Sequence, residues 1–193
     1  MKRVMEAQAD APTNYNELLA LPPNVLGQVL GGELVVYPRP PMRHALLSSL
    51  FGAQLCDPFD RGLNGPGGWW ILDEPAIQLG GDVLLPDLAG WQRNRMGEFP
   101  RSLPVQMVPD WVGEVLWPGT ASVDRIRKLP LYAHAGVRHV WLIDPVERSL
   151  EVYQSENGRC VLTAGFSGAG PFRAQPFEAV ELAVERLWRS AER

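Results

Sequence analysis

The sequence predicts a domain of the α/β (α+β) class, in which helices flank a mixed central β-sheet. Residues 42–56 carry apolar side chains at helical spacing, and residues 120–135 form a second helical segment. Strand-like segments lie between and after these helices, at residues 69–79, 82–91, 109–116 and 137–145. Strands that alternate with helices in this order favour a sheet with both parallel and antiparallel neighbours.

The first part of the chain predicts a short helix, a strand and then the long helix. Residues 15–21 suit a helix that the following Pro-Pro pair stops. Residues 31–38 suit a turn and a strand that ends at a proline, and a proline run then leads into the helix of residues 42–56. Residues 61–68 are rich in Gly, Pro and Asn, which predicts a loop.

Residues 69–79 and 82–91 predict a β-hairpin, since two glycines separate them. A polar loop over residues 93–105 leads to the strand of residues 109–116. After the second helix, residues 137–145 read as a buried strand and residues 149–165 as a hairpin that turns at Asn157-Gly158. A second amphipathic helix is expected over residues 176–193.

The helix of residues 120–135 is expected to begin at Thr120 or Ser122 and to end at Gly136. Residues three and four apart share a helix face. One stripe therefore holds Arg125, Lys128 and Tyr132, and a separate apolar stripe holds Ile126, Leu129 and Ala133. Because Pro130 removes a helical hydrogen bond, a kink just after Lys128 is expected.

Length and composition indicate one globular domain over residues 14–193, preceded by a flexible tail over residues 1–13. The chain has 193 residues, of which 46% are hydrophobic, enough to bury a good core. The N-terminus has no signal-peptide core, and no stretch reaches the ~18 apolar residues of a membrane span. Cys56 and Cys160 are expected to be free thiols. A soluble, cytoplasmic protein without a membrane partner follows.

The charge balance argues against a tight, non-specific binder of nucleic acid. The formal net charge is -4 and the pI about 5.4, so no global basic field attracts DNA. A local cleft of positive potential is still compatible with this balance. Apart from Lys2 in the expected tail, Lys128 is the only lysine of the chain.

Two carboxylates and this lysine are the candidate functional residues. Asp87 follows a proline in a strand-like segment, Glu114 lies near the centre of the next strand, and Lys128 lies on the helix after it. Two carboxylates can hold Mg²⁺ together with water and phosphate oxygens, and an ammonium beside them can stabilise a developing anion. Each of the three also has a purely structural interpretation: Asp87 as a residue at a strand end, Glu114 as a residue at the edge of the core, and Lys128 as a surface residue. Asp73-Glu74 is a rival pair, read as structural.

Four segments resemble the Uma-two family of restriction-endonuclease-like proteins, which has the PD-(D/E)xK nuclease fold. They are GELVVYPRPPMRHALLSSL (32–50), LPDLAGW (85–91), VGEVLWPGT (112–120) and DRIRKLPLYAHAGVRHVWLIDP (124–145). The resemblance implies a restriction-endonuclease-like sheet and a metal site for Mg²⁺ or Mn²⁺ at Asp87, Glu114 and the Val115 carbonyl. Lys128 would be the catalytic lysine, moved onto the helix from the strict position, where this chain has Leu116. His44 falls where the family has a histidine near the cleft. In a nuclease, Arg125, with Arg127 or His44 as further candidates, would contact the substrate phosphate.

The chain departs from the family pattern at a few positions. It has Trp117 and Gly119 where serine is usual, and Gln28 where a glutamate is typical. The Trp117 indole could narrow the cleft or offer a platform for base stacking. The loss of a carboxylate at Gln28 weakens a second metal site more than the first.

Two functions follow from these residues. The first is a Mg²⁺-dependent endonuclease that hydrolyses DNA phosphodiester bonds through Asp87, Glu114 and Lys128. The second is a catalytically silent dimeric module for interaction or nucleic-acid recognition on the same fold. A homodimer is expected in either case, because such domains commonly pair.

Overall fold

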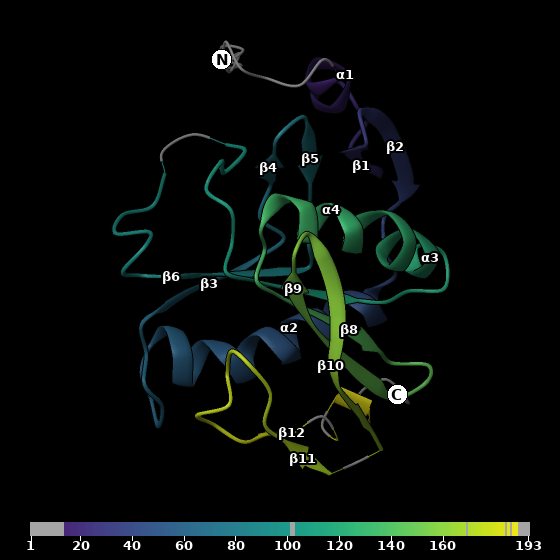
Figure 1. Cartoon of the computed structure of the whole chain (residues 1–193). Helices are drawn as coiled ribbons and strands as arrows, with labels where there is room; N and C mark the ends of the chain where they lie inside the picture. Colours follow the sequence, from purple (N-terminus) through teal and green to yellow (C-terminus); the bar gives the residue numbers. More distant parts are fainter. Residues whose placement is uncertain (1–13, 101–102, 169, 184, 186, 189–193) are drawn as a thin grey trace.

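A mixed six-stranded β-sheet forms the centre of the protein (Figure 1). The computed structural model describes residues 14–100, 103–168, 170–183, 185 and 187–188, so the expected tail of residues 1–13 lies outside the described residues. In spatial order the strands are β10 (Arg159–Ser167), β9 (Ser149–Glu156), β8 (His139–Asp144), β7 (Trp111–Val115), β6 (Leu88–Gln92) and β3 (Trp69–Asp73). Strands β7 and β8 are parallel, and the other neighbours are antiparallel. The predicted fold class is confirmed.

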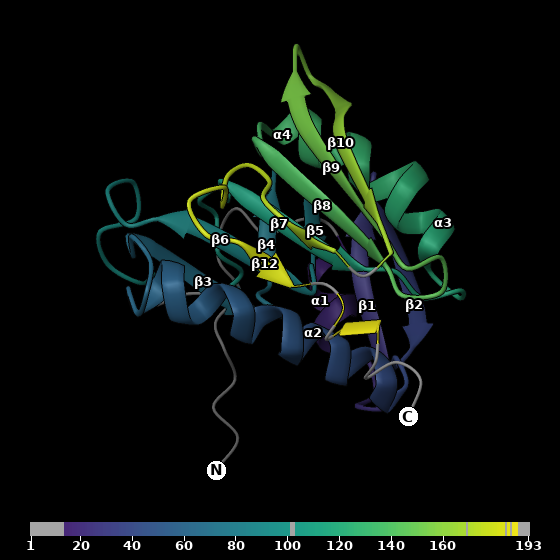
Figure 2. The ribbon, with the colours of Figure 1, turned by 90° about the horizontal axis from the view of Figure 1, so that it is seen from below.

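Helices cover both faces of this sheet, as Figures 1 and 2 show. Helix α2 (Met42–Leu55) packs on one face, where Phe51 contacts Trp111 and Trp141 of the sheet. Helices α3 (Ala121–Val123) and α4 (Leu129–Ala135) cover the other face, where Tyr132 and Val140 belong to a second core cluster. Alternate residues of β7 and β8 therefore enter two different cores, as expected of a sheet buried on both faces.

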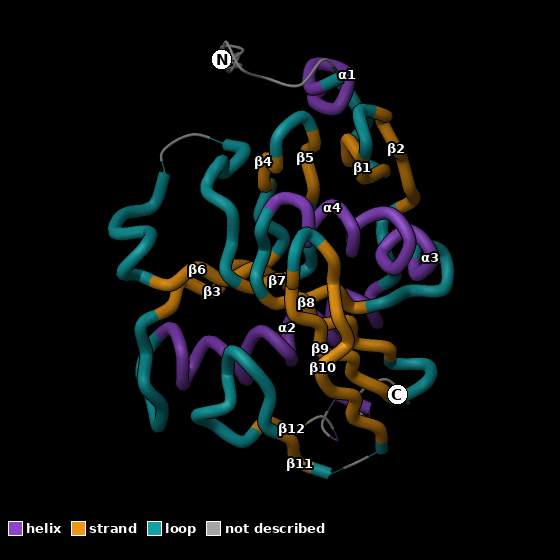
Figure 3. Tube along the Cα trace, viewed as in Figure 1, coloured by secondary structure: helices purple, strands orange, loops and turns teal. Residues whose placement is uncertain are grey.

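A smaller four-stranded sheet lies beside the large one, close to α1 (Tyr15–Leu19) (Figure 3). Its order is β2 (Glu33–Pro38), β1 (Val25–Leu30), β5 (Asp82–Leu84) and β4 (Ile77–Leu79). Strand β1 was not predicted. The predicted hairpin of residues 69–91 is divided between the sheets: β3 pairs with β6, whereas β4 pairs with β5. Pro75 and Pro86 lie at the two breaks, since proline cannot donate a ladder hydrogen bond.

The helix predicted over residues 120–135 is present but contains a π-helical turn, Asp124–Lys128, between α3 and α4. The wide turn ends two residues before Pro130, which has no N–H to donate. Gly136 ends the helix at φ 88°, as predicted. Ile126 does not share the predicted apolar stripe. Its side chain is 72% exposed, because the extra residue of the π turn rotates it out of phase with the rest of the stripe.

The C-terminal part differs from its prediction. The β9–β10 hairpin turns at Asn157-Gly158 as expected, with both residues at positive φ. The helix expected over residues 176–193 is wrong for its first half. There, Phe177 packs among core aromatic rings, and β12 (Leu182–Ala183) pairs with β11 (Pro171–Phe172). Among the described residues, no helix is long and apolar enough to cross a membrane.

Candidate active site

Asp87 lies between the two sheets, immediately before β6. Its neighbour Leu88 pairs with Gly113 of β7, so the same register sets Asp87 opposite Glu114. One carboxylate oxygen, Asp87 Oδ2, accepts a hydrogen bond from the backbone N–H of Val115 at 2.7 Å. Asp87 is therefore tied to the end of β7, next to Glu114.

Glu114 is almost fully buried, with 2% of its surface exposed, and its carboxylate is surrounded by donors. Lys128 Nζ lies 3.0 Å from Oε1 and 3.1 Å from Oε2, and the Tyr132 hydroxyl donates to Oε1 at 2.5 Å. Lys128 also pairs with Asp124 Oδ1 at 2.9 Å. The lysine thus reaches β7 from the helix, as the sequence predicted.

The buried charges of this cluster are unbalanced. Burial raises the pKa of Glu114 above its ordinary value, nearby Asp124 and Asp87 act in the same direction, and the Lys128 ammonium opposes them. Burial alone would lower the pKa of Lys128, but the carboxylates around it raise that pKa above its ordinary value. Three carboxylates therefore surround one ammonium that stays protonated. A divalent cation beside these carboxyl groups would favour their ionised forms.

His44, at the start of α2, joins the same cluster from the opposite face of the sheet. Its Nε2 donates to the Val115 carbonyl oxygen at 2.7 Å and lies 3.3 Å from Asp87 Oδ2. Burial would lower the pKa of His44, but the Asp87 carboxylate and the Val115 carbonyl raise it above its ordinary value. The imidazole thus links the Asp87 carboxylate to the end of β7.

These side chains line one small pocket of about 50 Å³. Two ionisable residues among the lining were not predicted: Asp124, and Tyr37 of β2, whose hydroxyl is buried and has no hydrogen-bond partner among the described residues. Asp124 could have been found from its spacing of four residues to Lys128, but Tyr37 comes from a separate sheet and had no such signal. Gln28 also lines the pocket, where its Oε1 accepts from the Leu85 N–H at 3.0 Å.

Arg125 and Arg127 do not line this pocket. Arg125 pairs with Asp144 at 3.2 Å and with Glu151 at 2.8 Å. Arg127 bonds to the Leu30 carbonyl at 2.7 Å. The π-helical turn directs Lys128 towards the carboxylates and both arginines away from them. The predicted contact of Arg125 and Arg127 with substrate stays a prediction. The rival pair Asp73-Glu74 does not line the pocket either.

The donor atoms at this pocket fit Mg²⁺ or Mn²⁺ through Asp87, Glu114 and the Val115 carbonyl. All three supply hard oxygen atoms, which these cations prefer, and Mg²⁺ commonly needs only one or two carboxylates besides water and phosphate. Among the residues that the structure describes, no group of three or more His, Cys, Asp or Glu side chains is arranged to hold a metal ion. A metal here would therefore depend on two carboxylates, with water or substrate oxygens completing its shell.

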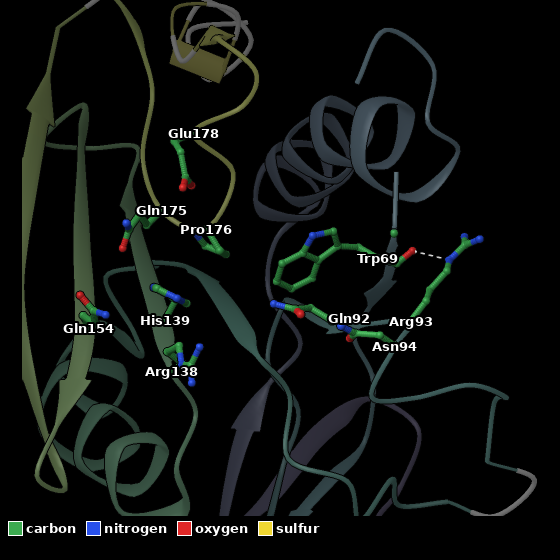
Figure 4. Close-up of a pocket in the computed structure, with 11 residues that line it drawn as sticks. Trp69, Gln92, Arg93, Asn94, Arg138, His139, Gln154, Gln175, Pro176 and Glu178 are labelled. Carbon is green, nitrogen blue, oxygen red and sulfur yellow. Dashed lines mark hydrogen bonds between the residues drawn. The ribbon is translucent and has the colours of Figure 1, made fainter. Parts of the chain in front are cut away.

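A larger cavity, of about 590 Å³, lies where β8 begins, at the opposite end of that strand (Figure 4). Arg138, His139 and Gln154 lie on one side of it and Trp69 on the other. Burial, together with the nearby Arg138, lowers the pKa of His139 to about 4. Glu178 is the one acidic residue among those that line the cavity. The larger cavity therefore lacks a carboxylate pair like that of the smaller pocket.

Comparisons with known proteins agree with this fold. Residues 15–185 match the family model "Uma2: Putative restriction endonuclease". A solved structure of similar fold, from Anabaena variabilis ATCC 29413, is described as a putative nuclease belonging to DUF820. It is 19% identical, with a TM-score of 0.72, and the match covers 91% of this chain and 97% of that chain. A comparison with curated proteins found no significant match. Since the family match spans most of the chain, the protein belongs to the Uma2 family of putative restriction endonucleases.

Proposed function

We propose that the protein is a metal-dependent endonuclease that hydrolyses phosphodiester bonds of DNA at the pocket of Asp87, Glu114 and Lys128. The observation that supports it most strongly is that these three residues, from a loop, a strand and a helix, line one buried pocket. Membership of a restriction-endonuclease family supports the same activity. Each residue alone would be weak evidence for a catalytic site, and the position of all three in one pocket strengthens that evidence.

Asp87, Glu114 and the Val115 carbonyl would hold Mg²⁺ or Mn²⁺. Such a cation, when bound, lowers the pKa of a coordinated water and withdraws charge from the phosphate. The hydrogen bond from the Val115 N–H fixes Asp87, and the Tyr132 hydroxyl fixes Glu114. Both carboxylates are therefore held in place before substrate arrives, which reduces the reorganisation that catalysis needs.

Lys128 acts in this proposal as a cation and not as a base. Its pKa is raised by the carboxylates around it, so the amine keeps its proton at neutral pH. The protonated amine can stabilise negative charge on a phosphate oxygen or on the attacking water through its own charge, while Glu114 and Asp124 hold it in place. A buried ammonium stabilises charge that develops in the transition state more strongly than an exposed one does.

A cleavage assay tests the proposal. Wild-type protein with Mg²⁺ or Mn²⁺ is expected to cut DNA, and EDTA is expected to stop it. Glu114→Gln and Asp87→Asn are expected to lower the rate at least ~100-fold, on the order of one removed electrostatic group, with circular dichroism unchanged. The matched control is Glu156→Gln, at the exposed end of β9. Full activity of Glu114→Gln would contradict the assigned site.

A catalytically silent nucleic-acid-recognition module is the second candidate, and one observation favours it. Both oxygens of Glu114 already accept hydrogen bonds, and the Val115 carbonyl accepts one from His44. Such satisfied groups can serve as an internal ionic network that holds the helix against the sheet. A folded protein that binds DNA in the presence of Mn²⁺ without cutting any DNA form would support this candidate.

A further inference from the structure

A second pocket, of about 270 Å³, adjoins the carboxylate pocket, and its lining is mostly apolar. It is lined by the buried residues Leu47, Val115 and Leu116 and by Trp117, Pro145 and Val146. We call it the Trp117 pocket. Trp117 does not line the carboxylate pocket, so it does not narrow the site as one reading of the sequence allowed.

The two pockets share His44 and Val115. The hydrogen bond between the His44 imidazole and the Val115 carbonyl oxygen, at 2.7 Å, lies at their boundary. A ligand that contacts His44 or Val115 in the first pocket therefore lies beside residues that also line the second.

The walls of the Trp117 pocket are fixed by the backbone. The Trp117 carbonyl accepts hydrogen bonds from Thr120 N at 2.9 Å and from Ala121 N at 2.7 Å. Gly119 lies beside the indole: a Cβ placed there would be 3.4 Å from Trp117 Cδ1. Trp117 and Gly119, which replace the serines usual in the family, are therefore direct neighbours in the structure.

The opposite wall is held by a turn after β8. Asp144 Oδ1 accepts from the N–H groups of Val146 and Glu147, at 3.0 and 3.1 Å. Val146 itself is 66% exposed and lies at the mouth of the pocket. The pocket is therefore formed in the absence of a ligand, which lowers the entropic cost of filling it.

Arg43 gives the pocket a positive charge. It lines the pocket, its side chain is exposed, and it makes no hydrogen bond or ion pair with any residue that the structure describes. An aromatic wall, apolar sides and an adjacent unpaired guanidinium are complementary to a nucleotide, whose base is flat and apolar on its faces and whose phosphate is an anion. The adjoining carboxylate pocket is the place proposed above for a phosphate of the same strand.

We propose that the Trp117 pocket receives one unpaired DNA base while the neighbouring phosphate lies at the carboxylate pocket. The inference rests on the proposed function and adds the substrate class: DNA with an unpaired nucleotide at the cleavage position. A base in a regular duplex would first have to leave the stack, which costs a few kcal/mol. The free energy needed is smallest for a base in single-stranded, bulged or mismatched DNA.

Fluorescence of 2-aminopurine tests this without any need for cleavage. Wild-type protein in EDTA is mixed with a duplex in which 2-aminopurine is either bulged or fully paired. Binding is expected to quench the bulged base, which stacks on Trp117, and to leave the paired base unchanged. Trp117→Ala is expected to bind the bulged DNA about 10-fold more weakly, as loss of one stacked base predicts, and to lose the quenching. Trp117→Phe should retain both.

Two further variants keep the result interpretable. Val146→Asp changes an exposed residue, so it leaves folding intact, and its charge at the mouth should reduce quenching as Trp117→Ala does. Phe99→Ala, an exposed aromatic residue outside the pocket, is the matched control and should behave as wild type. Equal quenching of bulged and paired DNA, or quenching retained in Trp117→Ala, would overturn the inference.

The fluorescence result and the cleavage result separate the two proposals. With Mn²⁺, bulged DNA is expected to be cut at least about 10-fold faster than the matched duplex, the ratio that corresponds to 1.4 kcal/mol. Trp117-dependent quenching without any cleavage would support the base pocket and contradict the nuclease proposal. Cleavage at equal rates on both DNAs, without quenching, would support the nuclease and overturn the base pocket.

Discussion

Lys128 Nζ lies 3.0 Å from Glu114 Oε1, although the lysine belongs to the helix and the glutamate to the sheet. The π-helical turn Asp124–Lys128 brings the lysine to this position. In the strict nuclease pattern the lysine would stand at Leu116, which here fills the core beneath α4. The helix thus supplies an ammonium that the strand lacks.

Lys128→Met should strongly destabilise the protein. It leaves the buried carboxylates of Glu114 and Asp124 without their cation, and breaking a buried pair costs about 3–5 kcal/mol. Urea unfolding measures the loss, with Arg159→Met, an exposed position of β10, as the control. The double variant Lys128→Met/Glu114→Gln should be more stable than Lys128→Met alone, because it carries one buried charge fewer. A loss no larger than in the control would contradict the assigned network.

Tyr132→Phe should lower both stability and activity. The hydroxyl donates to a carboxylate, and a hydrogen bond to a charged group contributes about 1.5–3 kcal/mol. Without it Glu114 is less firmly held, so turnover should fall while DNA binding changes little. Tyr153→Phe removes a hydroxyl that bonds to Glu151, away from the pocket, and serves as the comparison in both assays. Equal effects of the two variants would show that the Tyr132 hydroxyl has no special role.

His139 should make the protein less stable in acid. Burial lowers its pKa to about 4, against 6.5 for the ordinary group. Between these two values the unfolded chain binds more protons than the folded one, so stability rises with pH over this window. Above pH 6.5 the contribution is complete, and it disappears as the pH falls towards 4. Unfolding in urea at pH 4.5, 5.5 and 7.5 should therefore show a shallower pH dependence for His139→Gln than for wild type. His134→Gln, at an exposed position, should keep the wild-type slope.

Gly113→Ala should disturb the strand that carries Glu114. A Cβ at this position would lie 2.7 Å from the ring of Trp111, a fully buried side chain that has little room to move. Overpacking of this kind costs typically 1–3 kcal/mol. Gly165→Ala, where a Cβ meets nothing within 4 Å, is the matched control in another strand of the same sheet. Unfolding curves for the two variants that coincide would contradict this account of the packing.

The sequence was a good guide where local chemistry decides the structure. The Asn157-Gly158 turn, the end of the helix at Gly136 and the buried strand β8 follow from turn residues, positive φ and apolar runs. The convergence of Asp87, Glu114 and Lys128 was inferred from their residue types and from the family resemblance, and the structure brings the three side chains together.

Other features depend on packing between distant segments, which one sequence does not reveal. The division of the 69–91 hairpin between two sheets depends on the unpredicted strand β1, which pairs with β5. Phe177 is not in a helix as expected, because its ring packs against aromatic side chains of the core. The direction of Arg125 depends on one extra residue in a helical turn, a change that helical periodicity cannot detect.

The most direct test of the central claim is calorimetric titration of Mn²⁺ into the wild-type protein and into Glu114→Gln. The measurement requires no knowledge of the DNA substrate. We expect one Mn²⁺ to bind the wild type and binding to be lost in the variant, with Glu156→Gln unchanged. Equal Mn²⁺ binding by wild type and Glu114→Gln, or none by the folded wild type in the presence of a DNA oligonucleotide, would contradict a metal site at these carboxylates.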